Sequence, residues 1–299
     1  MITILGATGN VGGKIADLLI KKGEPVRLVA RSSNRLQQLA GNRAVAFAGD
    51  ANDADFLVKT FKDVDAVFTL IPPNPGTADF MEYADKIGES IARALETAKV
   101  KHVVNLSSTG AELSSGGTGP IKGLHNMEER LNRIKGLNVL HLRPSYFMEN
   151  LLWNIDLIKT KGINGNPIRG DLKIPMIATR DIAAYTADRL VKRDFWGATV
   201  QDLLGPRDLS LIEATEIIGS KIIRPGLSYI MFPYDEAEKG MIAMGLSPDM
   251  SRQYTEMSRA FNEGRIKIVA RTKENTTSTS FEAFCDEVFV PLYAHKRAA

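Results

Sequence analysis

Cysteine is almost missing from this sequence, since Cys285 is the only one among 299 residues. A lone cysteine cannot form an internal disulfide, so folding needs no oxidising compartment, and we expect a cytoplasmic protein. No motif of a catalytic nucleophile surrounds Cys285 in SFEAFCDEVF, and we interpret it as a small buried residue. We expect no signal peptide, because the first predicted strand begins almost at Met1.

Long hydrophobic runs, a strong net charge and clustered metal ligands are also missing. No apolar stretch is long enough to cross a bilayer. The net charge is only +3, with basic residues scattered among acidic ones, whereas a nucleic-acid surface needs basic residues gathered on one face. The four histidines are scattered and give no metal-ligand spacing. We therefore expect a small-molecule ligand, and no membrane, nucleic acid or metal.

Glycine is placed where it can serve a ligand. Gly6, Gly9 and Gly12 follow a short apolar run and open an amphipathic stretch in TILGATGNVGGKIADLLIKKG, which predicts strand, turn and helix. Such a turn lets backbone N–H groups approach an anion, and the helix N-terminus adds positive charge. A diphosphate fits this description; the alternative is a glycine-rich turn that binds nothing. The expected phosphate site comprises Gly6, Ala7, Thr8, Gly9, Asn10, Val11 and Gly12.

The first half of the chain alternates apolar runs with helical patterns. This alternation predicts an α/β fold with a doubly wound parallel sheet of the Rossmann type, whose ligands lie at the carboxyl ends of the strands. The expected strands are Ile2–Leu5, Val26–Arg31, Ala44–Ala48, Ala66–Ile71, His102–Ser107 and Val139–Arg143. The expected helices are Val11–Lys22, Ser33–Ala40, Ala54–Phe61, Phe80–Ala98 and Ile121–Ile134.

The rhythm weakens after residue 150. We expect a dinucleotide-binding domain at 1–150 and a smaller α+β substrate or lid domain at 151–299, with the strand near 199–204 as a candidate to return to the main sheet. KGINGNPIRGD has the composition of a loop. Helices are expected after caps near Asp181 and at Ser210, and twice more between Asp235 and Gly264.

The end of the second predicted strand indicates which nucleotide binds. An acidic residue there would accept from a ribose hydroxyl, but this chain has Arg31, Ser32 and Arg35. A guanidinium matches a phosphate in charge and geometry, so we expect NADP(H), the alternative being solvated surface arginines. Asp50, beside Ala51, is suited to the adenine amino group or to a helix cap. Ile71 and Pro72 offer a rigid apolar backbone for a flat ring, or form a plain loop.

Several motifs in order carry a family resemblance. They are GATGNVGG, the strand-end Arg31, GDANDADFL, VVNLSS, LRPSYFMENLL, TRDIAAYTADRL and TSFEAF. Together they resemble the NmrA-like branch of the atypical short-chain dehydrogenases over nearly the whole chain. The resemblance implies a Rossmann domain that binds NADP(H) and a small C-terminal substrate domain. The branch includes NADPH-dependent quinone, azo and arylmethane dye reductases, reductases of plant phenolic ethers, and regulators that bind NADP without catalysis.

The usual proton donor of short-chain dehydrogenases is missing. The helix PIKGLHNMEERLNRI has no tyrosine, although Tyr-x-x-x-Lys normally lies there. His125 and Lys122 are the two candidates to replace it, the first because it titrates near neutral pH and the second because the phenolic-ether reductases use a lysine nearby. The alternative for both is an uninvolved surface side chain.

A reductase can also work without a strong acid, if the protein only positions a flat substrate and excludes water. Ser107 and Tyr146 are expected at the nicotinamide end of the cofactor. The expected substrate contacts are Pro73, Ser108, Phe147, Asn150 and Trp153, because aromatic faces stack on flat rings; domain packing is an equal alternative for the aromatic residues.

Two functions therefore remain open. One is an NADPH-dependent reductase of a flat apolar molecule, such as a quinone or a dye. The other is an NADP-sensing, non-catalytic regulator that binds a protein partner. The missing tyrosine favours the regulator, and the aromatic cluster favours the enzyme.

Overall fold

A parallel sheet forms the centre of the molecule. The computed structural model describes residues 1–295, and in this range seven parallel strands take the order β10-β6-β5-β4-β1-β2-β3. Most central strands are buried on both faces, which explains their continuous apolar sequences. The strands are β1 (Ile2–Leu5), β2 (Val26–Ala30), β3 (Val45–Ala48), β4 (Ala66–Thr69), β5 (His102–Leu106), β6 (Asn138–Pro144) and β10 (Ala198–Leu203).

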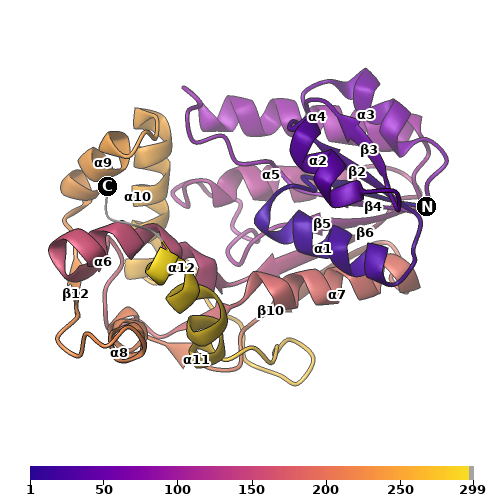
Figure 1. Cartoon of the computed structure of the whole chain (residues 1–299). Helices are drawn as coiled ribbons and strands as arrows, with labels where there is room; N and C mark the ends of the chain where they lie inside the picture. The colour runs from indigo at the N-terminus through magenta and orange to yellow at the C-terminus, as the bar shows by residue number, and fades with distance from the viewer. Residues whose placement is uncertain (296–299) are drawn as a thin grey trace.

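Helices cover both faces of this sheet (Figure 1). On one face α1 packs against α7, and on the other α4 lies between α3 and α5. The helices are α1 (Asn10–Lys21), α2 (Ser33–Ala40), α3 (Ala54–Phe61), α4 (Phe80–Thr97), α5 (Ile121–Asn132) and α7 (Thr179–Lys192). The predicted doubly wound α/β fold is confirmed, and each element of the first half lies within a few residues of its expected range.

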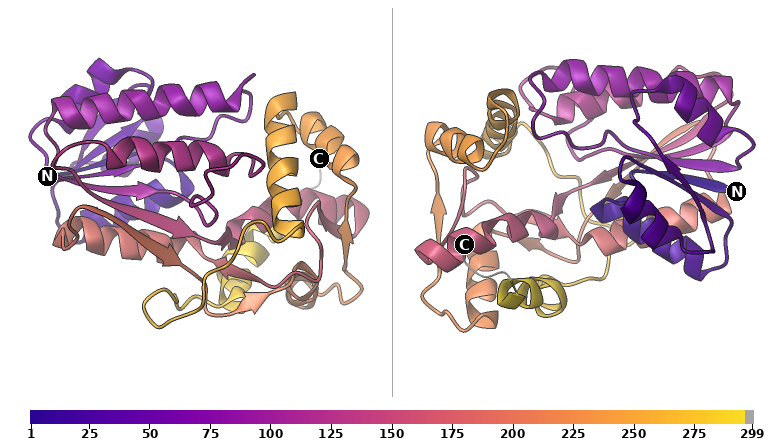
Figure 2. Two further views of the ribbon diagram at one scale, coloured as in Figure 1. Left: turned by 180° about the vertical axis from the view of Figure 1, so that it is seen from behind. Right: turned by 45° about the horizontal axis from the view of Figure 1, so that its top comes forward.

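The strand ends all meet at one edge of the sheet. Every pairing among the seven strands is parallel, so the segments that follow β1 to β6 leave from the same side. The glycine loop, Arg31, Asp50, Ile71, Ser107 and Tyr146 come from those segments. Helices α9 (Tyr234–Ala243) and α10 (Pro248–Asn262) stand across this edge from the sheet (Figure 2).

The second half of the chain contributes to both parts of the molecule. Helix α7 and strand β10 join the layers of the main sheet. Most of the remaining elements surround a separate apolar cluster, whereas α9 and α10 pack in two smaller clusters with residues of α4 and α5. The remaining elements are β7 (Tyr146–Phe147), the 3₁₀ segment η1 (Met148–Asn154), α6 (Ile155–Lys161), β8 (Ile163–Asn166), β9 (Ile174–Ile177), β11 (Asp208–Leu209), α8 (Leu211–Lys221), β12 (Ser228–Met231), α9, α10, α11 (Phe281–Phe284), the π-helical segment η2 (Cys285–Phe289) and α12 (Val290–His295).

Local signals in this half were partly misleading. The segment predicted as a loop contains β8, which pairs with β12. A side chain at Gly165 would clash with the Phe232 ring, so this glycine serves close packing and does not mark a loop. Asp181 is no cap, since α7 begins at Thr179 and the Asp181 carboxylate accepts hydrogen bonds from Thr279. Ser210 does cap α8, in a reciprocal pair with Glu213. Cys285 is fully buried, and burial raises the pKa of its thiol to about 12.

Candidate functional site

The glycine loop between β1 and α1 has the geometry of an anion site. Gly6 takes a left-handed conformation (φ +69°) and its carbonyl oxygen accepts from the N–H of Gly9 at 2.9 Å. A Cβ on Gly12 would lie 2.3 Å from that same oxygen, so only glycine lets the helix approach the loop. No side chain caps α1, and its first turn carries no acidic residue. The N–H groups of this turn therefore stay available to a phosphate.

The residues predicted to read the nucleotide surround this loop. Arg31, Ser32 and Arg35 are exposed beyond the end of β2, and Arg35 lines a shallow hollow with Ala7, Thr8 and Gly13. The Asp50 carboxylate accepts from the N–H of Asn52 at 2.9 Å, and Ala51 is buried. Asp53, not Asp50, caps α3. The guanidinium and hydroxyls thus lie on the same edge as the helix N-terminus.

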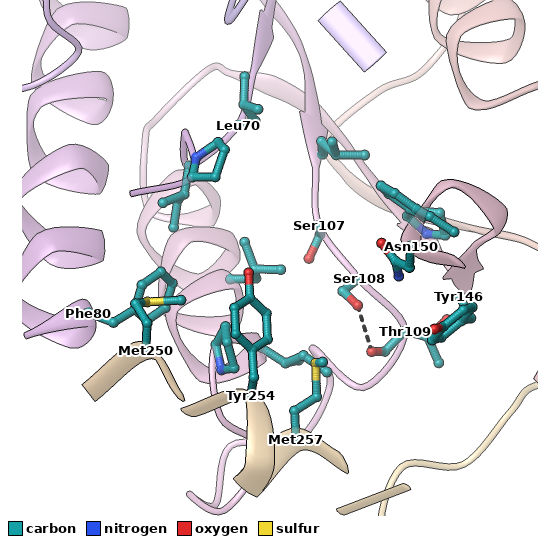
Figure 3. A pocket seen from close by; sticks show the side chains of 18 of the residues that line it. Leu70, Phe80, Ser107, Ser108, Thr109, Tyr146, Asn150, Met250, Tyr254 and Met257 are labelled. Atoms are coloured by element: carbon teal, nitrogen blue, oxygen red, sulfur yellow. Dashed lines mark hydrogen bonds between the residues drawn. The ribbon is translucent and has the colours of Figure 1, made fainter. Parts of the chain in front are cut away.

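A large cavity opens at the ends of β4, β5 and β6 (Figure 3). It encloses about 490 Å³, within the usual range for small-molecule sites. Leu70 to Pro75 form one wall, Leu106 to Thr109 form the floor, and Pro144 to Trp153 contribute the opposite wall. Met250, Tyr254, Met257 and Phe261 close it from α10. No charged side chain of the described residues lines this cavity, so it suits an uncharged, largely apolar molecule.

Many of the residues predicted from sequence meet in this cavity. Those that line it are Ile71, Pro72, Pro73, Ser107, Ser108, Tyr146, Phe147, Asn150 and Trp153. Ser107 is buried at its floor, and the Ser108 hydroxyl donates to the carbonyl of Thr109 at 3.0 Å. Burial raises the pKa of Tyr146 above its ordinary value, so its phenol stays protonated.

The two proposed proton donors lie outside the cavity lining. His125 Nδ1 is 2.8 Å from the carbonyl oxygen of Ala111, and Lys122 Nζ donates to the carbonyl of Ser114 at 2.8 Å. Helix α5 presents Ile121 and Leu124 to the cavity instead, and neither can donate a proton. The cavity therefore brings together the predicted substrate contacts and the predicted contacts to the nicotinamide end of the cofactor, but not Lys122 and His125.

A buried ion pair supports the cavity floor from behind. Arg143 on β6 donates to both carboxylate oxygens of Glu128 on α5, at 3.0 and 2.5 Å. Burial is the largest single influence and would raise the pKa of Glu128, but hydrogen bonds from Arg143 and Ser107 and the nearby positive charge together leave the pKa below its ordinary value. Because both charges are satisfied by each other, this pair holds α5 on the sheet and offers no acid to a ligand.

The sequence did not indicate that α10 contributes residues to the cavity. Met250, Tyr254 and Met257 recur every three or four residues, which predicts the buried face of a helix and nothing more. Phe80 at the start of α4 also lines the cavity. Their spacing does not indicate which face of the molecule they cover, since the contact joins segments about 170 residues apart.

Other classes of site find no support in residues 1–295. No group of three or more His, Cys, Asp or Glu side chains there could hold a metal ion. None of the described helices has the length and apolar character that a membrane span requires.

Comparisons with known proteins place the chain in a family. The model of the NmrA-like family matches residues 1–284. The uncharacterized oxidoreductase YesF of Bacillus subtilis is 29% identical over 284 residues, which cover 92% of this chain and 90% of that protein. Agroclavine dehydrogenase of Claviceps fusiformis is 25% identical over 302 residues, with 96% of each chain covered.

Solved structures with the same fold include two reductases. The NADPH-dependent quinone oxidoreductase of Escherichia coli, complexed with NADPH, superposes with a TM-score of 0.80 at 18% identity, covering 97% of this chain and 100% of that one. The triphenylmethane reductase of Citrobacter sp., complexed with NADP(H), also gives 0.80, at 17% identity, covering 96% and 99%. At these identities the likeness establishes the fold.

Proposed function

Because the chain belongs to the NmrA-like family, we propose that it is an NADPH-dependent reductase that delivers hydride to a flat, largely apolar molecule such as a quinone. The observation that carries this proposal is the uncharged cavity at the ends of β4, β5 and β6, on the same sheet edge as the glycine loop. The relatives support it, since they include an oxidoreductase and a dehydrogenase, and two of the solved structures with the same fold are NADPH-binding reductases.

The glycine loop and the residues beside it fit the nucleotide. In this proposal the uncapped N–H groups of α1 hold the diphosphate, and the open face of Gly9 leaves room for it. Arg31, Ser32 and Arg35 receive the 2′-phosphate, and Asp50 accepts from the adenine amino group. When bound, NADPH supplies the hydride. Ile71, Pro72, Ser107 and Tyr146 then hold the nicotinamide end of the cofactor.

The protein's part in the reaction is to position the substrate against the cofactor and to exclude water from the cavity. Pro73, Ser108, Phe147, Asn150 and Trp153 contact the substrate from the sheet side, while α10 covers it from the other. Proximity and orientation of two bound reactants can supply a large part of a rate enhancement. Since no charged side chain of the described residues lines the cavity, the proton reaches the product from water or from a neutral hydroxyl. Lys122 and His125, the two candidates from the sequence for that role, do not line the cavity, and substitution of His125 tests whether it supplies the proton.

The deciding experiment measures NADPH oxidation by the purified protein against quinones, triarylmethane dyes and azo dyes. We expect turnover with at least one quinone, and a smaller kcat/KM with NADH than with NADPH. Tight NADPH binding with no turnover above background across the panel would contradict the reductase. That outcome would favour the alternative, a sensor whose NADP occupancy alters its binding to a protein partner.

A further inference from the structure

A second chamber adjoins the main cavity. It encloses about 190 Å³ between η1, β8 and the helices α9 and α10. Residues that line both chambers mark the passage between them: Tyr146, Asn150, Trp153, Ile168, Tyr254 and Met257. A ligand that fills the main cavity and extends into the second chamber must pass these side chains. They are therefore well placed to determine which ligands fit.

Four of these six residues carry side-chain polar groups with no hydrogen-bond partner among the described residues, namely Tyr146, Asn150, Trp153 and Tyr254. Of these, Tyr254 on α10 and Asn150 on η1 come from opposite walls. Among the described residues, neither the phenol of Tyr254 nor the side-chain amide of Asn150 has a hydrogen-bond partner. By contrast, the hydroxyls of Tyr83, Tyr185 and Tyr229 all donate within the fold. Figure 3 shows the Tyr254 hydroxyl directed from α10 into the cavity, with Asn150 on the far wall. Asn150 is exposed and Tyr254 is half-buried, so water reaches both groups, and a ligand that displaces this water must replace its hydrogen bonds.

The surroundings of this pair also restrict the charge of a ligand. Neither chamber is lined by an Asp, Glu, Lys, Arg or His of the described residues. An ion entering would lose hydration without gaining a counter-charge. Burial raises the pKa of Tyr254, so its phenol remains a donor over the whole neutral range. The unused groups thus offer hydrogen bonds to a neutral oxygen acceptor.

We propose that Tyr254 and Asn150 form a recognition pair that selects uncharged ring compounds carrying carbonyl-type oxygens. This rests on the proposed function in taking the cavity as the substrate site. Tyr254 donates from α10 and Asn150 from η1, so a ring held between them presents oxygen atoms rather than hydrocarbon to both walls.

The test compares two ring compounds of similar shape, 1,4-naphthoquinone and 1,4-dimethylnaphthalene, which differ in having oxygens or methyl groups. Their dissociation constants are measured by calorimetry on the full chain with NADP⁺ present, so that no hydride is transferred. We expect Tyr254→Phe and Asn150→Leu each to weaken naphthoquinone binding by about 3- to 10-fold, the value of one neutral hydrogen bond. Binding of dimethylnaphthalene should change less than about twofold, on the same basis.

Tyr185→Phe is the matched control, because it removes a hydroxyl that pairs with Gln201 outside both chambers. It should leave both dissociation constants unchanged. If Tyr254→Phe leaves the ratio of the two constants unchanged, or if the parent binds neither compound, the recognition pair is overturned. If both substitutions weaken naphthoquinone binding as expected but the parent never oxidises NADPH with naphthoquinone, the recognition pair is supported and the proposed reductase activity is overturned.

Discussion

The carboxylate of Asp249, at the start of α10, accepts a hydrogen bond from the N–H of Phe80, at the start of α4, with an N···O distance of 2.8 Å. Both groups are buried, and the bond joins residues 169 positions apart. Phe80, Met250 and Leu246 pack around it in a small apolar cluster. This contact attaches α10, the helix that covers the cavity, to α4 in the Rossmann layers.

Asp249→Ala should therefore weaken the attachment of α10 to α4. The Phe80 N–H would lose its partner in a buried place, which costs about 1–3 kcal/mol. We expect a higher KM for the quinone, with the dissociation constant of NADPH nearly unchanged, because the glycine loop lies elsewhere on the edge. Steady-state kinetics and NADPH titration measure the two quantities. Asp53→Ala is the control, since it removes a cap of α3 without touching the cavity; an equal rise in KM there would contradict the assignment.

The fold was more predictable than the site for a physical reason. Strands such as β1 and β4 are covered on both faces and consist of continuous apolar residues, and the glycines after β1 meet a backbone constraint. These are local signals. The position of Tyr254 depends on how α10 docks against α4, a long-range contact that no periodicity encodes. Leu124 and His125 show the same limit, because one residue of helical rotation decides which of them lines the cavity.

The glycine loop allows ligand binding and packing to be separated. A Cβ on Gly9 would approach the Gly6 oxygen to 3.3 Å, whereas one on Gly12 would reach 2.3 Å. Gly9→Val should keep the fold but abolish NADPH binding, because its side chain occupies the open face of the loop. Gly12→Ala should instead lower the free energy of unfolding by about 1–3 kcal/mol, the cost typical of overpacking. Calorimetric titration and urea unfolding measure the two effects; normal NADPH affinity in Gly9→Val would remove the phosphate-loop assignment.

Arg31 should determine the choice between NADPH and NADH. Arg31→Asp replaces a phosphate-matching group by a carboxylate that repels the 2′-phosphate and accepts from a free hydroxyl. The loss of a charged hydrogen bond, about 1.5–3 kcal/mol, corresponds to about ten- to a hundredfold weaker NADPH binding. Arg43→Asp is the control. Arg43 is also exposed, but it precedes β3 and so lies at the amino ends of the strands, away from the glycine loop. If Arg31→Asp keeps the NADPH preference of the parent, Arg31 is a solvated surface residue with no role in the choice of cofactor.

His125 should matter little to turnover. Its ring is held by the carbonyl of Ala111 and does not line the cavity, so His125→Ala should change kcat with quinones by less than about threefold. A general acid that touches the substrate would instead be worth about 10²–10⁴-fold. A loss of that size with quinones but not with cationic dyes, in a folded variant, would identify His125 as the proton donor. Parallel assays with both substrate classes make this distinction.

The last prediction concerns stability against pH and depends on His141. Its Nδ1 accepts from the amide of Asn105 at 3.2 Å, and its Nε2 donates to Asn132 at 2.9 Å. The Asn105 oxygen is already used by the Thr69 hydroxyl, which fixes the amide and hence the neutral tautomer. Burial lowers the pKa of His141 to about 4; the nearby Glu128 raises it and Arg143 lowers it further.

The imidazole of His141 takes up a proton near pH 6.5 in the unfolded chain but only near pH 4 in the folded chain. The contribution of neutral His141 to the free energy of unfolding is therefore complete above pH 6.5 and decreases as the pH falls from 6.5 to 4. Between pH 7 and pH 5 the loss should be about 2 kcal/mol. Urea unfolding at both pH values measures it. His141→Gln keeps an amide in place of the ring but cannot titrate, so its stability should change much less over the same interval. An equal loss in this variant would assign the pH dependence to other groups.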